Sequence, residues 1–195
     1  MAKKESTLLQ LVLTLTIITV VAGVALAAVY SVTKAPIEAA QQQKKNEAIN
    51  KVLPGFSGEL KEISCQLEDD DDPLTVNMAY QDGALFGAAV QTYTNKAFGG
   101  RFDIMVGIDA EGNILGTAVL KHSETPGLGA KITDGDSHFI QQFVGFNPSK
   151  NQLKVKKDGG DIDAITAATI SSRAFCDAVD RAFMAFNKVK EENHE

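Results

Sequence analysis

The sequence has no tryptophan, only two cysteines and three histidines, and fewer positive than negative side chains. Lys and Arg together number 19 against 25 Asp and Glu, which gives a formal net charge of −6. Proteins that bind nucleic acid generally cluster positive charge to neutralise phosphates. The charge balance therefore argues against a general nucleic-acid binder, and we expect no nucleic-acid partner.

The few cysteines and histidines leave no pattern of metal ligands. Cys65 and Cys176 form no C-x-x-C pair, and His122, His138 and His194 do not have the spacing of a zinc site. We therefore expect no metal site. The two cysteines are far apart in the sequence, and although a disulfide is possible in an oxidising compartment, two separate thiols are the favoured interpretation.

Charge is also missing from one long stretch near the N-terminus. No residue between Ser6 and Thr33 is charged, and Leu8 to Tyr30 consists mostly of Leu, Val, Ile and Ala. A helix rises about 1.5 Å per residue, so this run reaches roughly 35 Å, enough to cross a hydrocarbon core of about 30 Å. The stretch predicts a single transmembrane helix.

A cleaved secretory signal peptide is the alternative for this segment. Lys3 and Lys4 would form its basic region, and Ala25-Leu26-Ala27 would suit a cleavage site. The apolar run is longer than the roughly 7 to 15 residues usual in signal peptides, which favours an anchor. No cysteine lies nearby, so a lipid on an N-terminal cysteine is excluded.

The flanking charges predict the orientation of the anchor. Residues 1–34 hold three Lys and one Glu, a net charge of +2, so the rest of the chain must carry −8 to give the total of −6. The positive end is expected to stay in the cytoplasm, although Lys34, Lys44 and Lys45 on the other flank weaken the asymmetry. We expect a single-pass protein of the cell (inner) membrane with its large domain on the extracytoplasmic side.

Three segments are expected: a cytoplasmic tip and transmembrane anchor at 1–34, a helical stalk at 35–55 and one domain at 56–195. Pro36 suits the first position of the stalk helix, and Pro54-Gly55 would end it. The stalk has too few apolar residues for a core helix. It is therefore interpreted as a polar stalk or as a surface that meets partner subunits.

An acidic run, Glu68 to Asp72, precedes Pro73. A calcium site is conceivable there, but the run lacks the alternate spacing and the glycine of a calcium-binding loop. A solvated loop is the favoured interpretation.

The domain itself has the pattern of an α+β fold. Four runs rich in β-forming residues follow the acidic loop, at 74–80, 84–93, 102–108 and 114–122. Asp82-Gly83 separates the first two runs and 109–113 the second two, which predicts two antiparallel hairpins. Apolar residues then recur at intervals of three to four between Ser171 and Val189, which predicts a carboxy-terminal helix.

The segment before that helix, DAITAATISS at 163–172, is the best candidate for a chemical site. It places two Thr and two Ser hydroxyls where a helix begins, among small alanines that let a bulky group approach the backbone. Unpaired N–H groups and the helix dipole stabilise a phosphate at such a terminus. Ser and Thr are also favoured helix caps, so plain capping is the alternative on spacing alone.

The pattern at 163–171 resembles the flavinylation motif of the FMN-binding domain family. The resemblance implies that Thr169 carries FMN through a phosphoester bond, formed by a Mg-dependent flavin transferase that uses FAD and releases AMP. Ala167 departs from the family, in which this position is often Gly. The motif residues expected to bind the cofactor are Asp163, Thr166, Ala168, Thr169 and Ser171.

A second segment, HSETPGLGAK at 122–131, resembles the HxETPGLG loop of the G subunit of Rnf-type ion-translocating electron-transport complexes, a loop that lies near the flavin. Pro126-Gly127 suits the middle of a type II turn. Glu124 is expected to tune the flavin, to accept a proton, or to act as a turn carboxylate that fixes backbone N–H groups. The loop residues implied to bind the cofactor are Glu124, Thr125, Gly127, Leu128 and Gly129.

A third segment, AFGGRF at 97–102, resembles a Gly-aromatic-Gly-Gly segment that faces the isoalloxazine ring in relatives. The resemblance implies ring contact by Phe98 or Gly99. Arg101 and Lys131 are considered as side chains that offset the charge of a reduced ring, with an exposed and solvated role as the alternative.

The family resemblance implies an electron-relay subunit with covalent FMN, which turns over no substrate alone. Its complex would couple electron transfer, from ferredoxin to NAD in the family, to Na⁺ or H⁺ translocation. The expected partners are another flavinylated subunit, iron–sulfur subunits and the flavin transferase. The apolar span has no Asp, Glu, Lys, Arg or His, so ion translocation would belong mainly to polytopic partners.

Three other functions stay open on the sequence. The nearest is the C subunit of a sodium-pumping NADH:quinone reductase, which shares the anchor and the flavinylated threonine. The second is a membrane-anchored interaction module without a cofactor. The third is a flavinylated reductase that acts on a soluble extracytoplasmic acceptor.

Overall fold

The computed structural model describes residues 7–68, 72–134 and 137–192. Its contacts divide the chain into two compact units, Met1–Lys44 and Lys45–Glu195. Lys3, Lys4, the Asp69–Asp71 part of the acidic run and His194 lie outside the described residues.

The first helix, α1 (Leu8–Val52), contains the apolar stretch and continues far beyond it. It is long and apolar enough to cross a membrane, with a mean hydropathy of 2.6 in its most apolar part. The expected helix start at Pro36 is wrong, since Pro36 lies inside α1. A proline removes one backbone hydrogen bond, but the Ala, Gln, Lys and Glu residues after it favour helix and carry α1 onward.

The last turns of α1 belong to the second unit and join its core. Ala48, Ile49 and Val52 are buried, together with Leu53, on one face of the sheet. The expectation that the stalk has too few apolar residues for a core is therefore wrong for its end. Spacing of three to four residues gathers these few side chains on one helix face, which is sufficient to cover part of a sheet.

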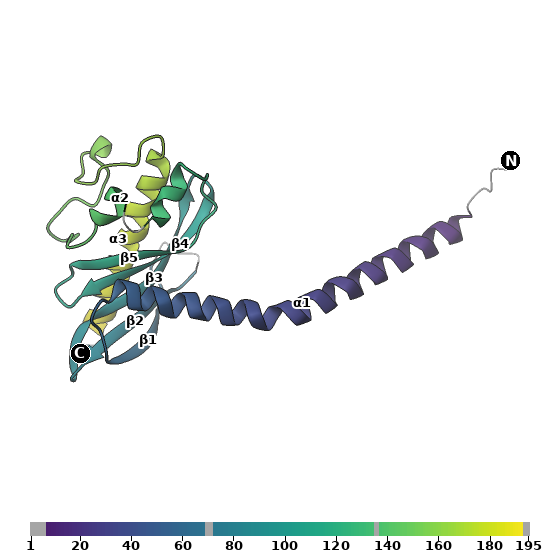
Figure 1. The fold of residues 1–195 in the computed structure, drawn as a ribbon, viewed down its shortest axis with the longest axis horizontal. Helices are drawn as coiled ribbons and strands as arrows, with labels where there is room; N and C mark the ends of the chain where they lie inside the picture. Colours follow the sequence, from purple (N-terminus) through teal and green to yellow (C-terminus); the bar gives the residue numbers. More distant parts are fainter. Residues whose placement is uncertain (1–6, 69–71, 135–136, 193–195) are drawn as a thin grey trace. The chain divides into compact units, whose positions relative to one another are not determined.

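An antiparallel sheet in the order β1-β2-β3-β4-β5 forms the middle of the second unit (Figure 1). Its strands are β1 (Glu59–Cys65), β2 (Leu74–Gln81), β3 (Ala84–Ala97), β4 (Gly100–Asp109) and β5 (Ile114–Lys121). Both predicted hairpins are confirmed. In the first, Gln81 pairs with Ala84, and Asp82 and Gly83 have φ values of 52° and 78°, as a type I′ turn requires.

Strand β1 was not predicted, because its residues give little sign of burial. It lies at the sheet edge and is mostly exposed from Glu59 to Ser64, so no alternation of apolar and polar residues is needed there. Only Cys65 at its end is fully buried.

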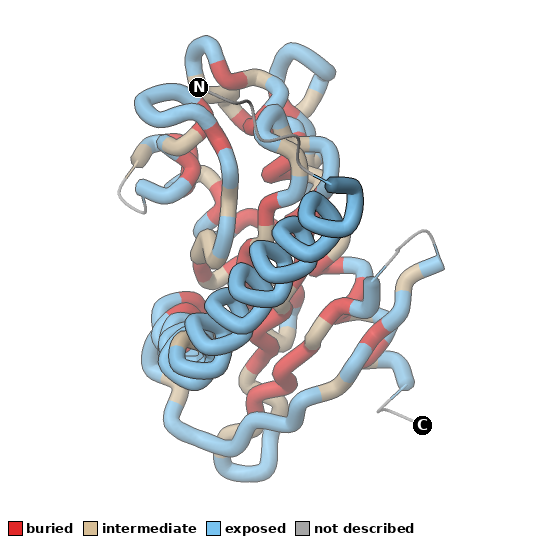
Figure 2. Tube along the Cα trace, turned by 90° about the vertical axis from the view of Figure 1, so that its right-hand side faces the viewer, coloured by how far each residue is buried: buried red, intermediate tan, exposed pale blue. Residues whose placement is uncertain are grey.

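The predicted carboxy-terminal helix is confirmed as α3 (Thr169–Glu192), which packs on the sheet face opposite to the end of α1. Figure 2 shows buried residues along the strands, while α1 is exposed over most of its length. Phe175 of α3 is fully buried among the rings of Phe102, Phe139 and Phe143, with centroid distances between 4.9 and 6.2 Å. This ring cluster ties α3 to the sheet and to the short helix α2 (His138–Gln141).

The two cysteines are both buried and form no disulfide in the part of the chain that the structure describes. The favoured interpretation of two separate thiols is confirmed. Burial raises the pKa of the Cys176 thiol to about 12.

Candidate functional site

A pocket of about 340 Å³ lies at the start of α3, where three segments that are distant in the sequence meet. Its lining comes from the turn at Phe98, from the loop between Glu124 and Gly129, and from residues 167–171. Small-molecule sites in proteins usually have volumes of roughly 300 to 1,000 Å³. The tertiary structure thus brings together parts of all three motifs that the sequence singled out.

The chain enters α3 through a tight turn that does not use Thr169. The N–H of Ala168 donates to the carbonyl oxygen of Ile165 at 3.0 Å. The hydroxyl of Ser172 accepts from the N–H of Ile165 at 3.0 Å and donates to the carbonyl oxygen of Ala168 at 3.0 Å. Ser172 therefore ties the segment before α3 to the first turn of the helix, and among the described residues the Thr169 hydroxyl makes no hydrogen bond.

Ala167 has a φ of 62°, in the left-handed region that favours glycine. This position is the one where the sequence departs from the expected motif. The turn is therefore formed with alanine in a conformation that glycine usually adopts.

The first turn of α3 presents donors toward the pocket. In the described part of the chain, no acceptor is bonded to the backbone N–H groups of Thr169, Ile170 and Ser171, as is usual at a helix start. These N–H groups carry the positive end of the helix dipole, which stabilises an anion. The start of α3 can hold a phosphate without a lysine or an arginine.

The loop at 122–131 adopts the expected type II turn. The N–H of Leu128 donates to the carbonyl oxygen of Thr125 at 3.2 Å, and Gly127 has a φ of 76°. The loop then continues as the short 3₁₀ helix η1 (Gly129–Thr133). Of the loop residues expected at the site, Glu124, Thr125, Leu128 and Gly129 line the pocket, whereas Gly127 shapes the turn and does not.

Glu124 is buried and takes the third of the roles that the sequence left open. Its Oε1 accepts the N–H of Gly99 at 2.7 Å, and its Oε2 accepts the hydroxyl of Ser171. The backbone N–H of Glu124 donates to Nδ1 of His122 at 3.1 Å. The carboxylate therefore fixes a backbone N–H group, as expected, and in addition a serine of the first turn of α3.

Several candidate residues lie outside the pocket lining. Asp163 pairs with Lys156, with 2.7 Å between Oδ2 and Nζ, and its backbone N–H donates to Gln142. Thr166 is exposed. Gly99 lines no part of the pocket, but its N–H is the donor to Glu124. Phe98 does line the pocket, and 69% of it is exposed.

Arg101 and Lys131, which were considered as side chains that offset the charge of a reduced flavin ring, do not line the pocket either. Arg101 pairs with Asp72 and Asp103, and these carboxylates raise its pKa. Its guanidinium carbon lies 4.0 Å from the centre of the Tyr93 ring. Lys131 is exposed.

Sequence reasoning missed Ile170 and did not assign Ala167 to the pocket, although both line it. Ile170 is 49% exposed between two polar residues at the start of α3. The sequence carries no signal for its place at the pocket, because the packing of α3 decides which side chains of its first turn are exposed. Among residues 7–68, 72–134 and 137–192, no group of His, Cys, Asp and Glu is arranged to hold a metal ion.

A second, more charged pocket of about 610 Å³ lies beside the first and shares Ile170 with it. Arg173 pairs with Asp158 over 2.6 Å and lowers the pKa of that carboxyl. Lys96 pairs with Asp177 over 2.6 Å. Four of the charged groups in this pocket are thus already paired.

The fold and the pocket define an α+β domain with a small-molecule site at the start of α3. Residues 98–184 match the FMN-binding domain family, a range that holds all three segments of the pocket. The resemblance read from the motifs at 122–131 and 163–171 is thereby confirmed.

Relatives of nearly the same length narrow the family further. The chain is 34% identical over 175 residues to the G subunit of the ion-translocating oxidoreductase complex of Shewanella piezotolerans, covering 85% of this chain and 82% of that one. It is 32% identical over 174 residues to the G subunit of the same complex from Vibrio cholerae, covering 85% and 83% of the two chains. The chain belongs to the family of G subunits of ion-translocating oxidoreductase complexes.

Proposed function

We propose that this chain is an electron-relay subunit that carries FMN covalently on Thr169 within an ion-translocating oxidoreductase complex. The observation that carries the proposal is the start of α3, at the edge of a pocket. There, among the described residues, a threonine hydroxyl without a bond lies beside three N–H groups without acceptors. The names of the relatives and the FMN-binding domain support the same function.

Attachment through the phosphate suits these groups. The Thr169 oxygen forms a bond to the phosphorus of the FMN half of FAD, the pyrophosphate bond breaks, AMP leaves, and the hydroxyl proton is released. The product is a phosphodiester with one negative charge. The N–H groups of Thr169, Ile170 and Ser171 stabilise that charge, because they point out of the positive end of α3.

The apolar part of the pocket would hold the ring. Phe98, Leu128 and Ile170 line the pocket and are 69%, 44% and 49% exposed. Large apolar side chains exposed together mark a surface that a partner or ligand covers. FMN would supply reversible electron transfer when bound, and the residues that line the pocket would position it.

A covalent bond has a physical purpose in this setting. We infer that α1 anchors the chain and that the domain lies on the extracytoplasmic side, where free FMN is scarce and a reversibly bound cofactor would be lost by mass action. The partners would be iron–sulfur and flavinylated subunits, with a flavin transferase for maturation. Among residues 8–30 of α1 no side chain is ionisable other than Tyr30, so ion translocation would belong to other subunits.

The test compares Thr169→Ala with Thr75→Ala. Thr75 is a partly exposed threonine of β2 that lies outside the pocket lining and outside the three motifs, so it is a matched control. After expression with the flavin transferase and denaturing electrophoresis, Thr75→Ala should keep the in-gel flavin fluorescence and Thr169→Ala should lose it. The mass of the Thr169 peptide should increase by FMN minus water. Flavin fluorescence that persists in denatured Thr169→Ala would contradict the assignment of Thr169 as the residue that carries FMN.

A further inference from the structure

Both carboxylate oxygens of Glu124 are bonded to protein donors from other segments. The residue is only 5% exposed. Its Oε1 accepts from Gly99 in the turn before β4, and its Oε2 accepts from Ser171 in the first turn of α3. A buried carboxylate is tolerated when it is hydrogen-bonded in this way. Glu124 therefore links its own loop to the two other segments that form the pocket.

The surrounding backbone leaves Glu124 little freedom to move. A Cβ atom at Gly129 would lie 2.2 Å from Oε2 of Glu124 and 2.6 Å from the Ser171 hydroxyl. At Gly99 a Cβ atom would lie 2.2 Å from the carbonyl oxygen of Ser123. Both glycines are therefore required for the close approach of the loop to the neighbouring segments.

We infer that Glu124 is a positioning residue for the attachment of FMN, acting through Ser171 and Gly99. Ser171 follows Thr169 by two residues in the same helical turn, so a bond that fixes Ser171 also fixes the backbone from which the Thr169 side chain projects. The bond to Gly99 holds the turn that carries Phe98 across the same pocket. This role rests on Thr169 being the attachment residue.

Substitutions at Glu124 distinguish the effect of its hydrogen bonds from the effect of its negative charge. Glu124→Gln keeps the size: its amide oxygen accepts from Gly99, and its NH₂ donates to Ser171, whose hydroxyl can reverse. Glu124→Ala leaves the Gly99 N–H and the Ser171 hydroxyl without an acceptor. A misplacement of about 1 Å at a reacting group costs up to ~100-fold in rate. We expect FMN transfer to Thr169 to slow ~10- to 100-fold in Glu124→Ala and to stay near the original rate in Glu124→Gln.

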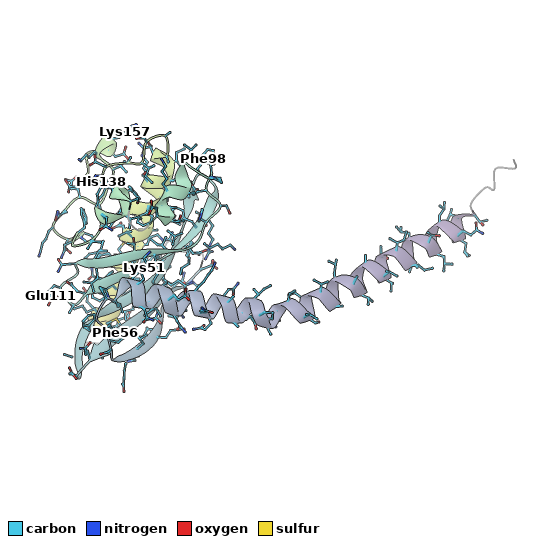
Figure 3. All side chains as sticks on the ribbon, in the orientation of Figure 1. Lys51, Phe56, Phe98, Glu111, His138 and Lys157 are labelled. Atoms are coloured by element: carbon cyan, nitrogen blue, oxygen red, sulfur yellow. The ribbon has the colours of Figure 1, made fainter. Side chains whose placement is uncertain are left out.

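Asp109→Ala is the matched control for a general loss of stability. Asp109 also accepts several hydrogen bonds in a turn, from the N–H of Glu111 at 2.9 Å and from the N–H and side-chain amide of Asn113 at 2.8 Å each. It ends β4 at the end opposite to the Phe98 turn, and Figure 3 shows the labelled Glu111 and Phe98 on opposite sides of the domain. Asp109→Ala should therefore lower the unfolding temperature without slowing attachment.

The experiment uses the full chain in detergent with FAD, Mg²⁺ and the flavin transferase. It measures the initial rate of mass gain on the Thr169 peptide and the visible circular dichroism of the attached flavin, which reports how firmly the ring is held. Slow transfer and a weakened dichroism in Glu124→Ala, with normal values in Glu124→Gln and Asp109→Ala, support the positioning role.

Two results would overturn it: an unchanged rate and dichroism in Glu124→Ala, or a Glu124→Gln variant as slow as Glu124→Ala, since the charge would then be what matters. If Glu124→Ala does not fold, Ser171→Ala decides, because it removes only one of the two links and should slow transfer as well. If the unaltered chain gains FMN but not on Thr169, or gains none, the proposed attachment itself fails. That result is distinct from failure of the Glu124 variants alone.

Discussion

Two glycines beneath the end of α1 offer a paired test of how this helix docks on the sheet. Gly107 of β4 and Gly116 of β5 are register partners. A Cβ atom at Gly107 would lie 1.9 Å from the carbonyl oxygen of Val52, whereas at Gly116 it would lie 3.4 Å from the Val52 Cα atom, close to ordinary contact. Gly107→Ala must therefore push the end of α1 off the sheet, and Gly116→Ala should fit.

The size of the effect follows from the side chains that would lose their packing. Ile49, Val52 and Leu53 are 6%, 0% and 2% exposed in the cluster between α1 and the sheet. Full burial of such a side chain stabilises by ~1.5 to 3 kcal/mol. Loss of about one to two of these burials lowers the free energy of unfolding by ~3 kcal/mol. For a domain of this size that corresponds to a fall of roughly 6 to 12 °C in the unfolding temperature.

The assay is thermal unfolding of the full chain in detergent, followed by far-ultraviolet circular dichroism. Gly116→Ala should change the free energy of unfolding by no more than ~0.5 kcal/mol, the usual range for a substitution that meets no clash. Equal unfolding temperatures for the two variants, or an unchanged value for Gly107→Ala, would refute the tight approach of Val52 to the sheet.

Two further predictions concern α3. Ala167→Gly should raise the free energy of unfolding by up to ~1.5 kcal/mol, because relief of ~1 to 2 kcal/mol of left-handed strain is partly offset by ~0.4 to 1 kcal/mol of extra freedom in the unfolded chain. A urea titration measures the change, and a decrease of more than about 1 kcal/mol would contradict the strained φ of 62° at Ala167. Burial raises the pKa of the Cys176 thiol from 9.0 to about 12, so between these values the folded chain holds a proton that the unfolded chain releases. The free energy of unfolding should therefore fall as pH rises above 9.0. Over this range the urea midpoint of Cys176→Ala should fall less steeply than that of the unaltered chain. Parallel pH profiles for the two proteins would contradict a raised pKa at Cys176.

The local elements were predictable because their signals lie within a few neighbouring residues. Asp82-Gly83 supplies the two positive φ values of a two-residue hairpin turn, and Gly127 supplies the one positive φ of a type II turn, after a proline suited to the preceding position. The apolar stretch of α1 and the periodicity of α3 are likewise contained in single segments. Each of these features formed as expected.

The predictions from the sequence failed where contacts with a segment distant in the sequence decide whether residues are buried or form a strand. The end of α1 has few apolar residues, yet it is buried because Gly107 and Gly116 let it approach the sheet closely. Strand β1 is polar, yet it forms because β2 offers it a pairing edge. The sequence of β1 does not show the free edge of β2, and the sequence at the end of α1 does not show the two glycines of the sheet beneath it.

The sequence by itself determined an apolar helix, two hairpins, a terminal helix and the threonine motif, because backbone preferences and periodicity act over short distances. Only the tertiary structure decided that Phe98, Glu124 and Thr169 border one pocket. It also decided that Glu124 accepts hydrogen bonds from Gly99 and Ser171, whereas Asp163 forms an ion pair with Lys156. Hydrogen bonds between distant segments depend on how the sheet and α3 pack, and no local pattern records that packing.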